Sequence, residues 1–237
     1  MLFNSRLYFI LLIVLFGTQL SFGQSSYVHV FSKQSQLALE HIQHHQTTYD
    51  TIFKKRACPP TFLLSVVLPE IANYNGFMDV LETRSSEVFY AQMGGDYANF
   101  SLGLFQMKPS FAEQLEKAAM EQEELSQFKF LSYYQIKDSV EIRETRIARI
   151  KDLEWRTEYL CCFYHLVSNR FKNVKFNSEY EKLKFYATAY NHGFDCDEAN
   201  IRKWMNIAFF PNSGAENDFI YGQVSIEFYK ILSQYEE

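Results

Sequence analysis

The chain of 237 residues is poor in the two residues that most often interrupt helices, with 5 prolines and 9 glycines. It also lacks sequence repeats, low-complexity tracts and any segment with the composition of a linker. These absences exclude a repeat architecture, and a composition that is 47% hydrophobic and 22% charged is typical of a globular protein. We therefore predict one mostly helical domain.

Clusters of positive charge and cysteine metal motifs are also missing. The formal net charge is −5, which argues against nucleic acid as a partner because phosphate binding needs clustered lysine and arginine. No Cys-x-x-Cys occurs, which argues against a zinc site. His41 and His45 lie four residues apart on an expected helix, but no carboxylate pattern completes a site, so we interpret them as part of a solvated face. We predict neither a metal nor a cofactor.

Long hydrophobic runs are absent beyond the first residues of the chain. Residues 1–23 contain Arg6 as their only charge, an apolar run over 7–16 and a polar stretch, which is the layout of a secretory signal peptide. The apolar run is shorter than the roughly 20 residues of a membrane span, although an uncleaved anchor is the alternative. We predict cleavage before Gln24, export to the periplasm or cell envelope, and a mature chain of net charge −6 without a membrane span.

The cysteines are few, and their spacing does not define a disulfide framework. Cys58, Cys161, Cys162 and Cys196 can pair in an exported protein, but four cysteines allow three pairings and the sequence does not choose among them. The adjacent Cys161 and Cys162 point to different sides of an expected helix, so one of them can also be a small core residue.

Hydrophobic periodicity predicts the helices. We expect an N-terminal helical segment over residues 24–56 that packs on a domain formed by residues 57–237. Residues 85–100, which contain a Gly-Gly pair, are the best place for a short hairpin or an irregular loop. The helices are expected over residues 33–55, 59–70, 107–130, 138–171 and 179–190.

Glu70 is the first candidate for chemistry. It follows Val66 by four positions and Val67 by three, so it projects from the apolar face of its helix. A carboxylate in that place is either a solvated helix end or a partly desolvated acid with a raised pKa, as a general acid near neutral pH requires.

The segment "SLGLFQMKPSFA" is the second candidate. Gly103 lets another backbone or a ligand come close, and Gln106 offers a donor and an acceptor without charge, which suits a sugar hydroxyl or N-acetyl group. Pro109 marks the start of the next helix. The alternative is a core glutamine whose hydrogen bonds are satisfied at a turn.

The third candidate is the end of the helix over 179–190. Tyr190 and Asn191 place an aromatic ring and an amide at the helix end, where they can line a groove, and Gly193 stands where a helix C-cap glycine would. The alternative is core packing followed by a C-cap.

Together the three elements resemble the lysozyme-like lytic transglycosylases, the group of soluble lytic transglycosylase and goose-type lysozyme. That family has a proline ten residues before its catalytic glutamate, as Pro60 precedes Glu70. Its Gly-Leu-Met-Gln-Ile-x-Pro-x-x-Ala is matched by residues 103–112, and its Ala-Tyr-Asn-Ala-Gly by residues 189–193. The resemblance covers roughly residues 57–205.

The resemblance implies a lysozyme-like helical domain with a catalytic groove, which acts on peptidoglycan glycan strands. It implies cleavage of the β-1,4 bond between N-acetylmuramic acid and N-acetylglucosamine, with Glu70 as the single general acid and base and 1,6-anhydro-muropeptides as products. The substrate-binding residues that it implies are Ser101, Gly103, Gln106, Tyr190 and Asn191.

The sequence departs from the family in the spacing of two elements. Glu70 and Gln106 lie 36 positions apart, about twice the family's usual gap. We therefore expect an insertion after the catalytic-glutamate helix, with an extra helix around 77–93. Glu82 and Glu87 lie inside it as rival acids; Glu87 restores the usual spacing to Gln106 but lacks the apolar-helix context.

A second departure concerns the residues next to the expected acid. Pro69 precedes Glu70 and should kink or end the helix, because proline donates no backbone hydrogen bond. This departure favours an alternative, a non-catalytic envelope protein of the same fold that binds glycan or a partner. A further alternative is a hydrolysing muramidase, in which Glu82 or Asp96 activates water.

Overall fold

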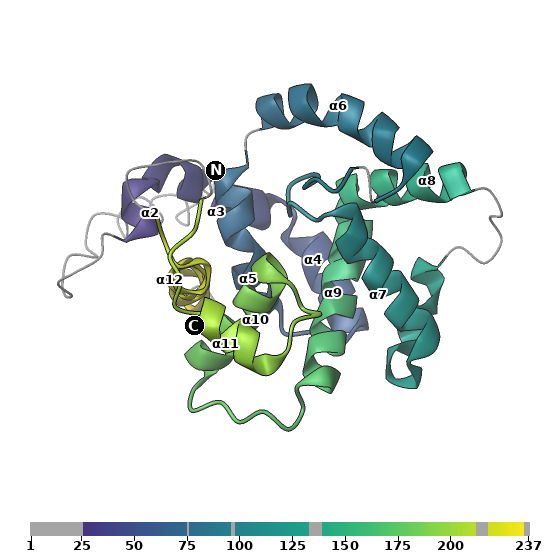
Figure 1. Ribbon diagram of the computed structural model, residues 1–237. Coiled ribbons are helices and arrows are strands. Elements are labelled where there is room, and N and C mark those ends of the chain that lie inside the picture. Colours follow the sequence, from purple (N-terminus) through teal and green to yellow (C-terminus); the bar gives the residue numbers. More distant parts are fainter. Residues whose placement is uncertain (1–25, 75, 96–97, 133–138, 212–217, 235–237) are drawn as a thin grey trace, which may run out of the picture.

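A computed structural model describes residues 26–74, 76–95, 98–132, 139–211 and 218–234, with the backbone alone over 76–84. The described residues form helices and two isolated β-bridges but no β-strand, so the prediction of a mostly helical fold is confirmed (Figure 1). The expected signal peptide, residues 1–23, lies outside the described residues. Within the described part of the chain, no helix is both long enough and apolar enough to cross a membrane.

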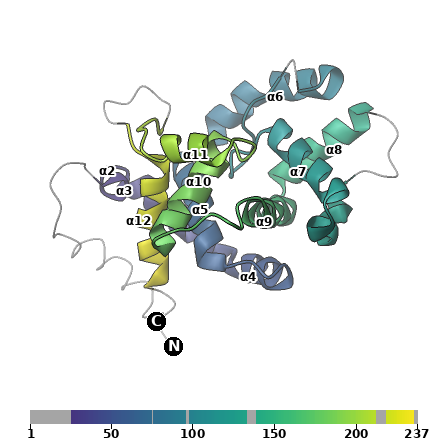
Figure 2. The same cartoon turned by 60° about the horizontal axis from the view of Figure 1, so that its bottom comes forward.

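The centre of the fold is helix α5 (Pro60–Asn73), which is apolar on every side. All residues from Phe62 to Ala72 are buried, because other helices surround α5 rather than cover one face. In both Figure 1 and Figure 2, α5 runs beside two helices from the C-terminal half of the chain. The helices that contact α5 are α3 (Ser32–His44), α4 (Gln46–Lys55), α9 (Leu153–Arg170), α10 (Glu179–His192) and α12 (Tyr221–Ser233).

The N-terminal helices belong to the same hydrophobic core. α3 packs on α5, and α4 packs on α9. The short helix α2 (Tyr27–Val30) contacts α12, where Glu227 accepts hydrogen bonds from the Ser26 hydroxyl at 2.7 Å and the Val28 amide at 3.1 Å. One cluster of buried residues therefore extends from Tyr27 to Phe228.

Helix α5 does not end at Pro69, where a kink or an end of the helix was expected. It continues to Asn73, although Pro69 has no N–H to donate to the preceding turn. The residues on either side of Pro69 are buried by the surrounding helices, and this packing offsets the missing hydrogen bond.

Three expected helices are each divided in two. The first breaks at His45 between α3 and α4. Another breaks at Asp152, whose carboxylate caps α9 by accepting from the amides of Glu154 and Trp155, both at 3.0 Å. Asp152 separates α8 (Ser139–Lys151) from α9. The third expected helix is divided at Gln122 into α7 (Pro109–Glu121) and the 3₁₀ helix η1 (Glu123–Leu131). The start of α7 at Pro109 agrees with the sequence prediction.

The segment after α5 contains the extra helix expected there. Helix α6 (Gly76–Met93) packs against α8 and lies along one edge of the molecule (Figure 1). The alternative expectation of a hairpin or irregular loop over 85–100 is therefore wrong up to Met93. The chain leaves the helix at Gly94, which has a φ of +89°. Neither α11 (Glu198–Trp204) nor α12 was predicted.

All four cysteines are free in the structure. Cys161 and Cys162 are both fully buried, so both, rather than one, are core residues. Burial raises the pKa of the Cys162 thiol, which keeps it protonated at neutral pH.

Helices α6 to α9 are joined by a buried ionic network around Arg146. The guanidinium of Arg146 lies 2.6 Å from Glu116 and 2.8 Å from Glu113, both on α7. It also donates to the Tyr90 hydroxyl on α6, and Tyr159 on α9 donates to Glu116 at 2.6 Å. Because Arg146 and Glu116 are 6% and 5% exposed, each charge depends on its partner for compensation.

We expect Arg146→Met to lower the free energy of unfolding by about 3–5 kcal/mol, because the Glu116 carboxylate would stay buried without its cation. Urea unfolding followed by circular dichroism measures this change. Arg146→Met/Glu116→Leu should recover part of the loss. Lys117→Met, which removes the exposed partner of Glu121, is the control and should change stability by less than about 1 kcal/mol.

Candidate functional site

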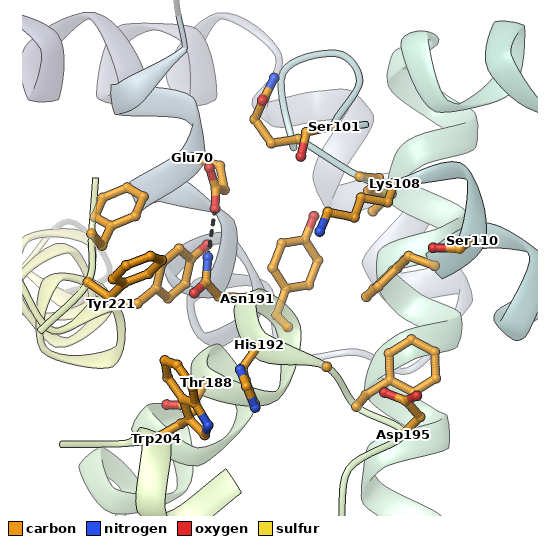
Figure 3. Close-up of a pocket in the computed structure, with 18 of the residues that line it drawn as sticks. Glu70, Ser101, Lys108, Ser110, Thr188, Asn191, His192, Asp195, Trp204 and Tyr221 are labelled. Atoms are coloured by element: carbon orange, nitrogen blue, oxygen red, sulfur yellow. Dashed lines mark hydrogen bonds between the residues drawn. The ribbon is translucent and has the colours of Figure 1, made fainter. Parts of the chain in front are cut away.

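A cleft of about 560 Å³ lies where the ends of several helices meet, including the end of α11 and the start of α12. Its walls come from the C-terminal ends of α5 and α10, the N-terminal end of α7 and the loop before α7. Figure 3 shows Glu70 at one side of the cleft, Ser101 and Lys108 across from it, and Trp204 with His192 at one end. The cleft has the size of a site for a small ligand or a short stretch of polymer.

Glu70 lines this cleft although it is only 9% exposed. Burial raises the pKa of its carboxyl to about 7, and three neighbours limit this rise. They are Asn191, whose Nδ2 donates a hydrogen bond to Glu70 Oε1 at 3.2 Å, the hydroxyl of Tyr221 and the charge of Lys108. The carboxyl is therefore partly protonated at neutral pH and can both give and take a proton.

Tyr221, on α12, was not identified from the sequence. Its hydroxyl donates to the Val66 carbonyl at 2.9 Å and also acts on the Glu70 carboxyl, whose pKa it lowers. No local pattern marks Tyr221, because it reaches Glu70 only through the packing of α12 on α5.

The loop before α7 shows why Gln106, an uncharged amide among apolar residues, occupies its position. Leu102 and Met107 form a pair of backbone hydrogen bonds of 2.9 and 3.2 Å, which close a tight turn between them. Gln106 sits in this turn with a φ of +49°, and its Nε2 donates to the Gly103 carbonyl at 2.8 Å. Gln106 also lines the cleft. Because the hydrogen bond uses only the amide nitrogen, the amide oxygen keeps its capacity to accept from a ligand.

Gly103 has the first of the two roles expected for it, since another part of the backbone comes close to it. Its φ is +62°, and a Cβ added to it would lie 3.2 Å from the Ile150 carbonyl at the end of α8. Gly103 is buried and is not among the residues that line the cleft. The prediction that it leaves room for a sugar is therefore wrong, since the space beside it is filled by protein backbone.

Tyr190 and Asn191 have different contacts in the site. The Tyr190 hydroxyl donates to the Phe105 carbonyl at 2.7 Å, which holds the loop before α7 against the end of α10. Its ring lines the cleft, while Asn191 donates directly to Glu70. Gly193 ends α10 with a φ of +145°, so its interpretation as a helix cap is confirmed.

Of the other expected site residues that the structure describes, one lines the cleft and one does not. Ser101 lines it. Glu87, on α6, forms an ion pair with Lys151 and is not among the lining residues. The side chain of Glu82 and the whole of Asp96 lie outside the described residues.

Asp195 is a second carboxylate in the cleft, where sequence patterns did not place one. It is exposed, and Figure 3 shows it across the cleft from Glu70. It sits in the loop after α10, and Arg170 holds this loop by donating to the carbonyls of Phe194 and Asp195 at 2.9 and 2.7 Å.

The described residues contain no group of three histidines, cysteines or carboxylates that could hold a metal ion. His41 and His45 lie with their ring centroids 4.5 Å apart. Burial lowers the pKa of His41 to about 4, and His41 Nε2 hydrogen-bonds with the Tyr49 hydroxyl at 3.2 Å. His41 is therefore partly packed into the core rather than fully solvated.

Comparisons of this chain with protein-family models, with curated proteins and with solved structures give no match. The site is therefore interpreted from its own residues.

We expect Glu70→Gln to stabilise the protein more at high pH than at low pH. The folded-state pKa of about 7 lies above the ordinary value of 4.5, so folding of the wild type favours protonated Glu70. That contribution to stability is complete below pH 4.5 and is lost as the pH rises through 7. From the low to the high end of this range, the free energy of unfolding of the variant minus that of the wild type should increase by about 3 kcal/mol.

Urea unfolding of both proteins at several values between pH 4 and pH 8.5 measures this difference. A constant difference across the range would show that the pKa of Glu70 is not raised in the folded protein. Glu87→Gln, which removes a carboxylate outside the cleft, is the matched control.

Proposed function

We propose that this protein is a lysozyme-like lytic transglycosylase, which cleaves the β-1,4 bond between N-acetylmuramic acid and N-acetylglucosamine in peptidoglycan. The observation that carries the proposal is Glu70, a buried carboxyl with a pKa raised to about 7 that opens on a cleft of about 560 Å³. Gln106, Tyr190 and Asn191, from motifs far apart in the sequence, line the same cleft. This supports the resemblance on which the proposal rests.

The first step uses Glu70 as a general acid. Its proton passes to the glycosidic oxygen as the bond from that oxygen to the muramic C1 breaks. The charge left on Glu70 is stabilised by the hydrogen bond from Asn191 Nδ2. Burial of Glu70 keeps the proton available near neutral pH.

The second step uses the ionised Glu70 as a base. It removes the proton from the muramic 6-hydroxyl while that oxygen bonds to C1, which gives a 1,6-anhydro ring and restores the protonated acid. The reaction consumes no water, and so it requires no second carboxylate. Gln106 and Ser101 would hold polar groups of the sugar in place.

A hydrolysing muramidase is the second candidate function, and the observation that favours it is Asp195. Glycosidases that use water need a second carboxylate, and Asp195 is exposed in the same cleft. In that reaction Asp195 activates a water molecule, and the product has a free reducing end in place of the anhydro ring.

Residues 1–23 suit this function, since their layout is that of a signal peptide for export. Peptidoglycan lies in the cell envelope, where an exported protein would meet it. We therefore propose the periplasm or cell envelope as the site of action, with glycan strands as the partner.

We expect the purified mature chain to release muropeptides with a 1,6-anhydro end from isolated sacculi, and Glu70→Gln to abolish their release because glutamine cannot donate the proton. Mass spectrometry separates the anhydro product from the hydrolysed one, which is heavier by one water. Glu87→Gln should keep wild-type activity.

Three results would contradict the assignment in different ways. Release by Glu70→Gln at the wild-type rate would remove Glu70 from the acid role. Release of reducing ends by the wild type, lost in Asp195→Asn, would establish the muramidase. Binding to sacculi by a folded wild type that releases nothing would indicate a non-catalytic protein.

The dependence of the rate on pH tests the acid more directly. The protonated form of Glu70 starts the reaction, so kcat/KM should fall about tenfold per pH unit above a pKa of about 7. A soluble glycan substrate measured between pH 5 and pH 9 gives this profile. A rate that stays constant up to pH 9 would exclude Glu70 as the proton donor.

A further inference from the structure

One end of the cleft is formed by aromatic side chains that the proposed reaction does not use. Phe209 lines the cleft and is 55% exposed. Trp204, the last residue of α11, lines the cleft beside it, with ring centroids 6.5 Å apart and an interplanar angle of 76°. Single apolar side chains scattered over the exterior of a protein are common. Apolar side chains grouped at the end of a cleft are more often explained by a ligand that binds there.

Contacts within the protein hold the Trp204 ring and the backbone of Phe209. The His192 ring stacks on Trp204 with centroids 4.1 Å apart and planes 23° from parallel. Asn200, one turn before Trp204 on α11, hydrogen-bonds with His192 Nε2 at 3.1 Å. The Phe209 amide donates to the Phe219 carbonyl at 3.0 Å, which fixes the backbone of Phe209. A rigid surface loses little conformational entropy when a ligand binds.

The aromatic end is continuous with the position of the acid. His192 follows Asn191 in α10, and Asn191 donates to Glu70. In Figure 3, His192 and Trp204 lie on the side of Asn191 away from Glu70, with Asp195 across the cleft. A polymer that lies on the aromatic rings therefore continues past Asn191 to the carboxyl of Glu70.

The chemistry of this end matches a sugar ring. A pyranose has an apolar face of C–H groups and a rim of hydroxyls, so it needs a flat apolar surface bordered by polar groups. Trp204 and Phe209 stand at 76° to one another, so one ring supplies the flat apolar face and the other forms an apolar wall beside it. Asp195 and His192 supply polar groups at its border.

We propose that Trp204 and Phe209, with His192 supporting Trp204, form a binding subsite on which one ring of an N-acetylated β-1,4-linked glycan stacks. The class of ligand rests on the proposed function, whereas the aromatic surface does not. The subsite holds the strand so that a neighbouring glycosidic bond reaches Glu70. Trp204 and Phe209 are binding residues in this inference, and His192 is a positioning residue.

The two tryptophans of the chain allow a direct test. Trp155 lies on α9 under the guanidinium of Arg149, 3.8 Å from its ring centroid, and is not among the residues that line the cleft. In Trp155→Phe, Trp204 is the single indole fluorophore. We expect titration of this variant with the tetramer of N-acetylglucosamine to give a saturable change in its emission.

Isothermal titration with the same tetramer measures the contribution of each ring. Trp204→Ala and Phe209→Ala should each raise Kd by about tenfold or more. Tyr180→Ala is the matched control, since Tyr180 is 44% exposed on α10, packs with Tyr229 and lies outside the cleft. Circular dichroism confirms that each variant is folded.

The possible results separate this inference from the proposed function. Unchanged affinity in folded Trp204→Ala and Phe209→Ala, or an emission of Trp204 that does not respond to the tetramer, would overturn the subsite even if sacculi are cleaved. Loss of affinity in both variants without cleavage by the wild type would support the subsite and reject the enzyme. If Trp204→Ala does not fold, Phe209→Ala and the emission of Trp204 decide the question.

Discussion

The burial of α5 on every side is the constraint on which the rest of the structure depends. A helix that is apolar all round must be enclosed, and five other helices provide that enclosure. Glu70 lies near the C-terminal end of this helix, so the same packing that forms the core removes water from its carboxyl. The raised pKa of Glu70 is thus a direct consequence of how the fold buries its central helix.

The cleft exists because helices end around α5 rather than pass over it. The loop before α7 is closed by its own backbone and by Gln106, and Tyr190 fastens it to the end of α10. One tyrosine hydroxyl therefore connects the second and third sequence motifs, while Asn191 connects the third motif to Glu70. The geometry of the acid, the amide and the aromatic wall depends on these few polar contacts between otherwise apolar elements.

Much of the local structure could be predicted from the sequence. The periodicity located most of the helices, and the proline at the start of α7 and the glycine at the end of α10 marked their boundaries. The errors have physical causes. Asp152 divides one expected helix because its carboxylate caps the next one, which periodicity does not reveal. Pro69 was expected to interrupt α5, but packing on both sides of it outweighed one missing hydrogen bond.

The sequence by itself determined which side chains are able to perform chemistry: a glutamate on an apolar helix, a neutral amide in a turn and an aromatic–amide pair at a helix end. Only the tertiary structure decided how they are used. It placed Ile150 against Gly103 and so closed the space expected for a sugar, and it brought Tyr221 to Glu70. It also set Trp204 and Phe209 at the end of the cleft. These outcomes depend on contacts between residues far apart in the chain, which local pattern and spacing do not encode.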